Sequence, residues 1–322
     1  MKAVVCTRYG SPDVLELQET EKPVPKSNEV RIRVRATSVG PSDCAFRKSD
    51  PVLIRFMYGF RKPKYPILGT ELAGEVEAVG ADVSGFKTGD HVFGLSAKTF
   101  GAYAEYKCLP EAAPLAVKPA AFTYEEAVAV CDGGLTALTF LRDKAKVGRG
   151  QKVLINGASG AVGIYAVQLA KHYGAEVTGV CSAGNAELVR AMGADRVVDY
   201  GKEDFAASGH TYDVIFDAVG KRSYRQCKRA LTAKGIYLTT VPSLSILYHM
   251  LSTAAFGGRK AMFAAAGLMQ NKDNLAYIRQ LCEAGALRPV IDRRYPMEQI
   301  AEAHRYVDTG RKKGNVVIAI EP

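Results

Sequence analysis

A glycine-rich turn at residues 157–163 has the residue types and the spacing of a site that binds phosphate. The turn reads Gly-Ala-Ser-Gly-Ala-Val-Gly and follows an apolar run at residues 153–156. A helical pattern continues over residues 164–173, and a second apolar run spans residues 177–181. Strand, glycine turn, helix and strand within about 30 residues form the βαβ unit that a dinucleotide-binding turn needs.

The physical chemistry of a helix start explains the glycines of this turn. A pyrophosphate at a helix N-terminus meets free backbone N–H groups and the positive end of the helix dipole. A Cβ on Gly160 would hold the phosphate away, and Gly163 lets the helix lie close to its strand. The spacing is GxxGxxG rather than the commoner GxGxxG, and the alternative is a turn without a ligand; the flanking strands favour binding. The predicted cofactor contacts from the turn are Gly157, Ser159, Gly160, Ala161, Val162 and Gly163.

Size and composition are typical of a soluble, two-domain enzyme. The chain has 322 residues, of which 48% are hydrophobic and 24% charged. It shows neither the pattern of a signal peptide nor an apolar run of about 18 residues, which a membrane-spanning helix would need. The seven cysteines are scattered and form no CxxC pair, so a reducing compartment fits. We therefore expect a cytoplasmic location.

The chain is basic, with a net charge of +10 and a pI of about 9.2. Such a balance can indicate a nucleic acid or an acidic membrane surface as partner. The basic clusters, at residues 61–64, 221–229 and 311–313, are short and far apart in the sequence, and no RNA-binding motif accompanies them. We therefore expect no nucleic-acid partner and no membrane partner, and attribute the charge to a solvated surface that attracts an anionic cofactor.

The chain falls into two regions with different secondary-structure patterns. Residues 1–120 carry short alternating runs, such as residues 30–35, separated by glycine and proline, which predict a compact, mostly antiparallel, barrel-like domain. From residue 124, helical and strand patterns alternate, which predicts a doubly wound parallel sheet. Thr123 and Glu126 fit a capping box before the first helix, Gly133 and Gly134 can break the helical pattern, and a further helix is expected at 223–231. Residues 243–268 are apolar and ambiguous. A helix at 297–307 and a strand at 316–320 lie beyond the sheet pattern, so the tail is expected to pack on the first domain.

These motifs together resemble the medium-chain dehydrogenase/reductase superfamily over the whole chain. The N-terminal pattern is carried by residues 68–74, 89–94 and 101–106, and the turn at 157–163 is similar to that of the zinc-free quinone oxidoreductase branch. Residues 180–182, 187–190 and 289–292 resemble its reticulon-interacting, mitochondrial-type subgroup and bacterial relatives. The resemblance implies a GroES-like β-barrel catalytic domain (1–122), a Rossmann cofactor-binding domain with a doubly wound parallel sheet (123–268) and a C-terminal segment (269–322) returning to the catalytic domain. It also implies an active site in the cleft between the two domains.

The residues at the zinc positions of this superfamily differ here. Zinc-containing members carry a cysteine in Gly-x-Cys-x-x-Asp and a histidine in Gly-His-Glu, whereas this chain has Gly40-Pro41-Ser42-Asp43 and Gly69-Thr70-Glu71. Catalytic zinc takes about three protein ligands, which Glu71 alone cannot supply, and Cys44 or Cys131 would need a histidine partner that the motif lacks. No metal site is therefore expected. The proposed catalytic residues are Ser42 and Asp43, with helix capping as the alternative role of Asp43.

The residues after the second strand of the βαβ unit bear on cofactor choice. NAD specificity usually rests on a carboxylate about 20 residues past the glycine turn, but residues 181–185 read Cys-Ser-Ala-Gly-Asn. Ser182 and Asn185 can donate hydrogen bonds to a 2′-phosphate, unless they only cap the next helix, and Tyr200 matches a phosphate-contacting tyrosine of the family. Relatives often carry Arg or Lys near positions 184 and 185, where this chain has Gly and Asn. We therefore expect a preference for NADPH that is milder than in those relatives. The resemblance implies further cofactor contacts at Thr136, Val219, Val241, Pro242 and Asn315.

The resulting hypothesis is an NADPH-dependent, zinc-independent reductase of quinones or α,β-unsaturated carbonyls (a quinone, enone or enal as substrate). Residues 50–65 and 242–258 are variable segments expected to shape the acceptor pocket. One alternative is an alcohol dehydrogenase of the same superfamily; another is a non-catalytic dinucleotide-binding protein that acts through partners. A homodimer is expected, because the apolar segment 261–268 is a candidate edge strand and an unpaired apolar edge is normally covered.

Overall fold

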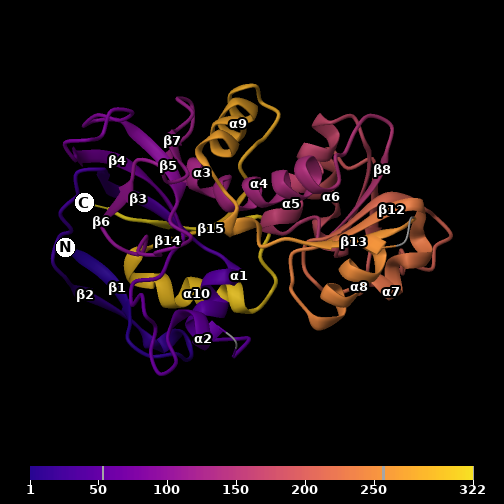
Figure 1. The fold of residues 1–322 in the computed structure, drawn as a ribbon, viewed down its shortest axis with the longest axis horizontal. Coiled ribbons are helices and arrows are strands. Elements are labelled where there is room, and N and C mark those ends of the chain that lie inside the picture. Colours follow the sequence, from indigo (N-terminus) through magenta and orange to yellow (C-terminus); the bar gives the residue numbers. More distant parts are fainter. Residues whose placement is uncertain (53, 256–257, 322) are drawn as a thin grey trace. The chain divides into compact units, whose positions relative to one another are not determined.

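The computed structural model describes residues 1–52, 54–255 and 258–321, which form two compact units (Figure 1). The first unit combines Met1–Asp132 with Gln270–Ala284 and Arg288–Pro322. The second consists of Gly133–Met269 and Gly285–Leu287. Within the described residues, no helix is both long enough and apolar enough to cross a membrane.

The first unit is built on a seven-stranded sheet in the order β14-β15-β3-β4-β5-β7, with β6 pairing β3 off this path. The β14–β15 pair is parallel and the other pairs are antiparallel. A separate antiparallel pair, β1-β2, accompanies this sheet. The strands are β1 (Lys2–Cys6), β2 (Leu15–Glu19), β3 (Glu29–Val39), β4 (Glu71–Val79), β5 (His91–Leu95), β6 (Tyr106–Pro110), β7 (Leu115–Val117), β14 (Ile291–Pro296) and β15 (Asn315–Ala319).

Strand β3 shows why alternating residues form this sheet. Val30, Ile32 and Val34 are at most 1% exposed, whereas the arginines between them are half-buried. Each second residue therefore enters the core while the charged side chains stay hydrated, as the alternation at residues 30–35 predicts. The GroES-like fold class expected from the sequence is confirmed.

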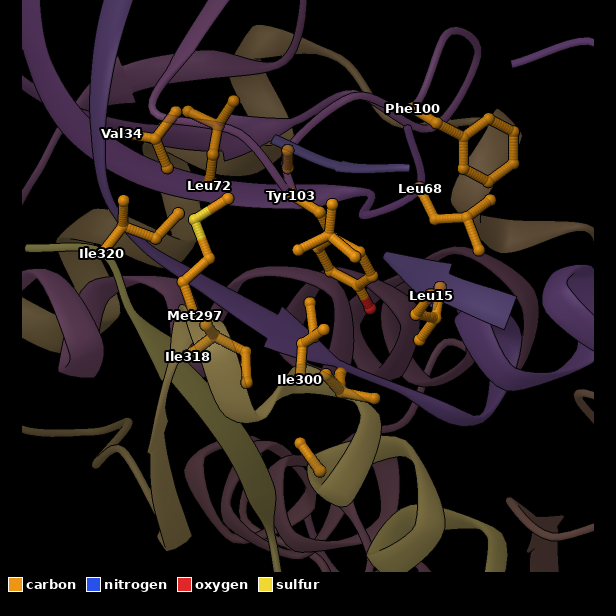
Figure 2. Packing of buried hydrophobic residues seen from close by; sticks show 14 of the residues in the cluster. Leu15, Val34, Leu68, Leu72, Phe100, Tyr103, Met297, Ile300, Ile318 and Ile320 are labelled. Carbon is orange, nitrogen blue, oxygen red and sulfur yellow. The ribbon is translucent and has the colours of Figure 1, made fainter. Parts of the chain in front are cut away.

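The tail supplies part of the hydrophobic core of the first unit. Figure 2 shows Met297, Ile300 and Ile318 from the tail packed in one cluster with Leu72 and Tyr103. The predicted helix at 297–307 is present as a short 3₁₀ turn followed by α10. The helical segments of this unit are η1 (Pro12–Val14), α1 (Pro41–Lys48), α2 (Ile54–Tyr58), α3 (Tyr124–Ala129), α9 (Lys272–Glu283), η6 (Met297–Gln299) and α10 (Ile300–Asp308).

The second unit is a six-stranded, wholly parallel sheet in the order β10-β9-β8-β11-β12-β13. The strands are β8 (Lys152–Asn156), β9 (Glu176–Cys181), β10 (Arg196–Asp199), β11 (Tyr212–Asp217), β12 (Leu231–Thr239) and β13 (Lys260–Phe263). Val153, Leu154 and Ile155 are all 0% exposed, as in a parallel strand covered on both faces. The chain passes from β8 to β9 on one side and later to β11 on the other, so the strand order switches at β8. Ligands of doubly wound sheets bind beyond the carboxyl ends of the strands at such a point.

The helical segments of the second unit follow the expected alternation with the strands. They are α4 (Cys131–Leu138, which begins at the unit boundary), the π-helical segment η2 (Thr139–Lys144), α5 (Ala161–His172), η3 (Ala183–Asn185), α6 (Ala186–Ala191), α7 (Tyr224–Cys227), η4 (Lys228–Ala230), α8 (Leu244–Ala255) and η5 (Ala266–Leu268). The Rossmann-like doubly wound sheet expected from the sequence is confirmed.

Three local expectations differ from the structure. Gly133 and Gly134 can break a helical pattern, but α4 runs through both, and Gly133 packs so close to Ala161 and Tyr165 of α5 that a Cβ would not fit. The helix expected at 223–231 ends earlier, since Leu231 already begins β12. The ambiguous segment 243–268 contains α8 and β13, and the candidate edge strand ends at Phe263.

The first unit also extends further than residue 122. Helix α3 begins with the predicted capping box: the N–H of Glu126 donates to the Thr123 hydroxyl at 3.2 Å, and the Thr123 N–H donates to the Glu126 carboxylate at 2.9 Å. This helix packs on β3, β4 and β15, and the first unit therefore continues to Asp132.

Candidate active site

Backbone hydrogen bonds hold the glycine turn rigidly at the end of β8. The N–H groups of Gly157 and Ala158 both donate to the carbonyl of Val180 at 3.0 Å, which ties the turn to β9. The N–H of Gly160 donates to the carbonyl of Gly157, also at 3.0 Å. Gly157 has a φ of +80°, a left-handed conformation that glycine adopts without steric cost.

The three glycines of the turn have different surroundings. A Cβ on Gly163 would lie 2.9 Å from Cα of Ala158 and closer still to the carbonyl of Gly157, so only glycine allows this packing of α5 on its strand. Among the described residues, a Cβ on Gly160 would meet only the Gly157 carbonyl, at 3.4 Å. The protein therefore leaves the outer side of Gly160 open. The first N–H groups of α5, from Ala161 to Gly163, have no acceptor within the helix and carry the positive end of its dipole. This arrangement fits a pyrophosphate.

Three neutral hydrogen-bond donors gather at the carboxyl ends of β9 and β10. The side-chain amide of Asn185 donates to Oγ of Ser159 in the glycine turn at 2.9 Å. Neither Ser182 nor Asn185 caps the following helical turn with its side chain, so the capping alternative is not what the structure shows. The N–H of Tyr200 donates to the carbonyl of Cys181 at 3.2 Å, and the Tyr200 side chain is 64% exposed. Of the three side chains, that of Asn185 thus contacts the glycine turn directly.

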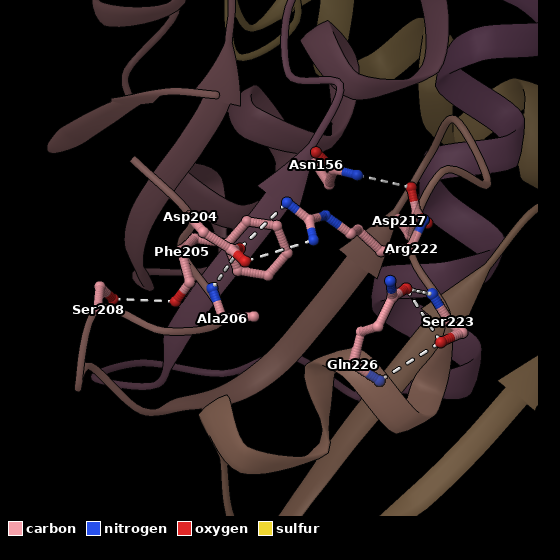
Figure 3. A network of polar contacts seen from close by, with 9 residues as sticks. All are labelled: Asn156, Asp204, Phe205, Ala206, Ser208, Asp217, Arg222, Ser223 and Gln226. Carbon is pink, nitrogen blue, oxygen red and sulfur yellow. Dashed lines mark hydrogen bonds and ion pairs between the residues drawn. The ribbon is translucent and has the colours of Figure 1, made fainter. Parts of the chain in front are cut away.

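Asp217 organises the loop on the other side of β8, a role that the sequence analysis missed. Its fully buried carboxylate accepts hydrogen bonds from the side-chain amide of Asn156 (2.9 Å) and from the N–H groups of Val219 (3.2 Å), Gly220 (3.0 Å) and Arg222 (2.8 Å) (Figure 3). The loop that carries Val219 is therefore shaped by one carboxylate. An acidic residue at the end of a buried strand, just before a glycine, was the available signal.

The remaining predicted cofactor residues fall into two groups. Thr136 is a nearly buried residue of α4, whereas Val219, Val241 and Pro242 are exposed just beyond β11 and β12. Every predicted cofactor residue except Asn315 therefore lies in the second unit. Asn315 begins β15 in the first unit, and its side-chain amide donates to the carbonyl of Val290 at 3.3 Å.

Asp43 is a buried carboxyl group at the start of α1 in the first unit. Its Oδ2 accepts the N–H of Gly40 at 2.9 Å, so Asp43 does cap its helix. Its other oxygen has no hydrogen-bond partner among the described residues. Burial raises the pKa of Asp43 to about 7, with the Gly40 hydrogen bond lowering it and the charge of Asp132 raising it. The neighbouring Ser42 is exposed.

A second buried acid, Glu71, lies at the start of β4. The hydroxyl of Ser38 donates to Oε1 of Glu71, and the N–H of Asp132 donates to Oε2 at 2.8 Å. Burial, with the negative charge of Asp132, raises the pKa of Glu71 to about 8. Lys312 belongs to the same neighbourhood: burial lowers its pKa to about 8, while the charge of Glu71 opposes this shift. The first unit thus concentrates ionisable groups that change charge near neutral pH.

The tail gives Cys44 a histidine neighbour, which the sequence analysis did not foresee. Sγ of Cys44 lies 3.3 Å from Nδ1 of His304. Burial raises the pKa of Cys44 and lowers that of His304 to about 3, so both groups are neutral. The fully buried Arg47, ion-paired with Asp308 at 2.6 Å, adds a positive charge close to His304. A buried guanidinium disfavours a second cation here, and among the residues described no group of three or more His, Cys, Asp or Glu is arranged to hold a metal.

Comparisons with known proteins cover the whole chain. A family profile described as an alcohol dehydrogenase GroES-like domain matches residues 26–120, and one described as a zinc-binding dehydrogenase matches residues 192–318. The chain is 33% identical over 331 residues to a chloroplast envelope quinone oxidoreductase homolog of Arabidopsis thaliana, covering 99% of this chain and 98% of the relative. It is 30% identical over 344 residues to a chloroplastic NADPH-dependent alkenal/one oxidoreductase of the same plant, covering 99% and 79%. The solved structure of the quinone oxidoreductase from Coxiella burnetii superposes with a TM-score of 0.89 at 29% identity, covering 100% of this chain and 99% of that one.

Proposed function

This chain belongs to the medium-chain dehydrogenase/reductase superfamily, and we propose that it is an NADPH-dependent, zinc-independent reductase of quinones or α,β-unsaturated carbonyls. Relatives aligned over nearly the whole chain are oxidoreductases of these acceptor classes. The observation that carries the proposal is the glycine turn at the switch point of the parallel sheet, with a rigid backbone, an open outer side at Gly160 and a free helix start. Within the superfamily this arrangement supports a nicotinamide dinucleotide as cofactor.

The cofactor preference rests on the residues around the end of β9. Ser182, Asn185 and Tyr200 are neutral donors suited to a 2′-phosphate, and no carboxylate follows β9 before Glu187. A carboxylate there would hydrogen-bond the ribose and repel the phosphate. With neutral donors and no Arg or Lys at 184 or 185, the preference for NADPH should be modest.

Reduction of either acceptor class requires a proton as well as a hydride. When bound, the reduced nicotinamide supplies the hydride. We assign the proton to the first unit, where the pKa of Asp43 is raised to about 7 and one of its oxygens is free of hydrogen bonds among the described residues. An acid that is partly protonated at neutral pH can act as a proton donor. The exposed hydroxyl of Ser42 completes the proposed catalytic pair as a hydrogen-bond donor to the acceptor.

Zinc independence is supported by the residues at the positions where zinc-containing members hold their metal. Thr70 replaces the histidine, and both carboxylate oxygens of Glu71 already accept hydrogen bonds from Ser38 and Asp132. The Cys44–His304 pair supplies two neutral donors beside a buried guanidinium, which is short of the three ligands that catalytic zinc takes. We therefore place the activation of the acceptor on hydrogen bonds rather than on a Lewis acid.

A homodimer and a cytoplasmic location remain parts of the proposal. Strand β13 lies at the edge of the parallel sheet and, among the strands of the described residues, pairs with β12 alone. Pairing of this edge with a second copy would cover it, and light scattering at micromolar concentration tests it, since a monomeric mass would count against the dimer. The seven cysteines are all free, as in proteins of reducing compartments; imaging of the tagged protein would test the location.

The experiment that tests the function is a screen of acceptors with NADPH. The panel should contain short-chain quinones, enals and enones, together with primary and secondary alcohols assayed with NADP⁺ in the reverse direction. The proposal expects turnover with quinones or enones and none with alcohols. Turnover confined to alcohols would support the alcohol dehydrogenase alternative, and NADPH binding without turnover would support a non-catalytic partner protein.

A further inference from the structure

Helix α8 carries a stripe of large apolar side chains that face solvent. Leu244, Leu247, Tyr248 and Leu251 are 87%, 46%, 68% and 77% exposed. Their spacing of i, i+3, i+4 and i+7 places them on one side of the helix. Of the side chains described in α8, only Ile246 is buried. The helix contains no Lys, Arg, Asp or Glu, and its length of 12 residues is too short to span a bilayer.

The chain around α8 is strongly and uniformly basic. Residues 218–269 contain eight Lys or Arg and no Asp or Glu. Those whose side chains are exposed are Lys221, Arg225, Lys228, Arg229, Lys234 and Lys260. Arg222 is excluded because it is ion-paired with Asp204 at 3.1 Å (Figure 3). The cluster at residues 221–229 therefore belongs to a longer basic segment that holds most of the net charge of +10, whereas the clusters at 61–64 and 311–313 lie outside it.

The fold brings three of these cations, Lys221, Arg225 and Lys228, beside the apolar helix. A groove of about 670 Å³ runs along α8 and is lined by Arg225 and Lys228 on one side and by Tyr248 and Ser252 on the other. A smaller groove, of about 290 Å³, is lined by Lys221 together with Ser243 and Ser245. The rings of Tyr224 on α7 and His249 on α8 lie 4.9 Å apart, which fixes the two helices as neighbours. Burial, together with the charges of Arg225 and Lys228, lowers the pKa of His249, as expected beside concentrated positive charge.

We propose that α8 and the cations beside it form a docking surface for a membrane that contains acidic lipids. An amphipathic helix with exposed leucines and flanking Lys or Arg enters the boundary between headgroups and acyl chains, where apolar burial and attraction to acidic headgroups act together. Tyr248 is suited to the headgroup level, because its ring is apolar and its hydroxyl is polar. The proposal departs from the expectation of no membrane partner, which treated the basic clusters as separate.

The positive charge of this segment favours an acidic membrane over a second copy of the chain or a nucleic acid. A second copy seated on the same face would bring its own cations against these, in a segment without a single carboxylate to pair with them. A nucleic acid would satisfy the cations but not the leucines, which have no aromatic face for a base to stack on. Pairing of two β13 edges would use backbone groups of that strand, whereas membrane docking uses side chains of the neighbouring α8.

Membrane docking would also bear on the supply of substrate, a point that rests on the proposed function. Quinones and long-chain enals are apolar and concentrate in bilayers. A reductase held at the surface would meet them there. The cytoplasmic leaflet carries acidic lipids, so the proposed location provides a suitable surface.

The test is co-sedimentation of the full chain with vesicles of phosphatidylcholine alone and of phosphatidylcholine with about one third phosphatidylserine, without cofactor or acceptor. Binding to acidic vesicles only, weakening as salt is raised, is expected. The triple variant Arg225→Gln, Lys228→Gln, Arg229→Gln should lower partitioning roughly 100-fold, since each cation near an acidic surface contributes about 1 kcal/mol. The matched variant Arg149→Gln, Lys152→Gln, Lys202→Gln removes equal charge from other exposed sites of the same unit and should bind nearly as well as wild type.

The apolar half of the surface is tested by Leu244→Ser with Leu251→Ser, against Val24→Ser, which changes an equally exposed residue (81%) of the first unit. The double variant should lose at least tenfold in vesicle binding at unchanged melting temperature, and the Val24 variant should not. Three results would overturn the proposal. They are absence of binding to acidic vesicles at low salt, an equal loss of vesicle binding in the charge-matched control variant, and tighter binding to a single-stranded oligonucleotide than to vesicles. So would a dimer that the double leucine variant converts to monomer without any vesicle binding by the wild type. Turnover of a water-soluble quinone, measured separately, shows whether the proposed function stands independently.

Discussion

The side-chain amide of Asn185 donates a hydrogen bond to Oγ of Ser159, and this contact joins the two loops that the sequence assigns to the cofactor. Ser159 lies in the glycine turn, and Asn185 follows the strand whose end usually decides between NAD and NADP. The contact leaves the second N–H of the Asn185 amide and the hydroxyl hydrogen of Ser159 as donors. Asn185 therefore supports the turn and remains a candidate ligand for the ribose phosphate.

We expect removal of any one of the three donors near β9 to lower kcat/KM for NADPH more than kcat/KM for NADH. Ser182→Ala, Asn185→Ala and Tyr200→Phe should each lower kcat/KM for NADPH about 3- to 10-fold, because one neutral hydrogen bond contributes about 1 kcal/mol. The values for NADH should change less, since NADH lacks the 2′-phosphate. Ser208→Ala, which removes a hydroxyl bonded to the carbonyl of Phe205, is the control. Equal losses with both cofactors would show that these residues only shape the loops.

Substitutions at two glycines of the turn should separate an effect on folding stability from an effect on cofactor binding. Gly163→Ala should destabilise the protein by about 1–3 kcal/mol, because the new Cβ overlaps the backbone of the turn. Gly160→Ala should cost about 1 kcal/mol or less and yet raise the Kd for NADPH at least tenfold, since its Cβ points to the open side. Gly148→Ala, outside the proposed site, is the matched control, since a Cβ there meets nothing within 4 Å among the described residues. Thermal melts and fluorescence titration with NADPH measure the two effects. Normal NADPH binding by the Gly160 variant would refute the assigned phosphate position.

Glu71 should make the unfolding free energy fall as pH rises. Its pKa is raised in the folded state to about 8, so the folded protein holds this proton more tightly than the unfolded chain does. The associated stability is fully present below the unfolded pKa of about 4.3 and is lost as pH rises through about 8. Glu71→Gln removes the titration and should be more stable than wild type at pH 9, on the order of 2–4 kcal/mol.

Urea unfolding of wild type and Glu71→Gln between pH 5 and pH 9 measures this difference. Glu21→Gln, at an exposed position, serves as the control. Parallel stability profiles for wild type and the Glu71 variant would mean that Glu71 is not held protonated by the fold.

Activity should not depend on a metal ion. Thr70 cannot replace a histidine ligand, and Glu71 is engaged by Ser38 and Asp132. Elemental analysis of the purified protein should therefore find less than stoichiometric zinc, and EDTA treatment should leave turnover unchanged. One tightly bound zinc per chain, with turnover lost on its removal and restored by its return, would contradict the zinc-free assignment.

Local patterns predicted much of the fold. Strict alternation identified β3, the capping box identified the start of α3, and the run from the glycine turn to β9 identified the βαβ unit, because each signal lies within a few residues. The sequence did not show that the helix continues through Gly133 and Gly134 of α4, since a glycine that allows close helix packing and one that ends a helix look the same locally.

Features formed by distant residues could not be predicted. Cys44 and His304 are 260 positions apart, and only the return of the tail brings them together. Glu71 was noted as a residue without zinc partners, but its contacts with Ser38 and Asp132 depend on the folded sheet. The basic cluster at residues 221–229 is visible in the sequence, whereas its position beside α8 depends on the packing of α7 against α8.

The most direct test of the central claim is the steady-state rate of a water-soluble quinone or enone reduction with NADPH and with NADH, measured on the chelator-treated wild-type protein. We expect turnover with at least one member of the acceptor panel and a kcat/KM for NADPH above that for NADH. A ratio of roughly 3 to 30 would reflect neutral donors without an arginine clamp. No turnover with any acceptor, or a kcat/KM for NADH equal to or above that for NADPH, would contradict it.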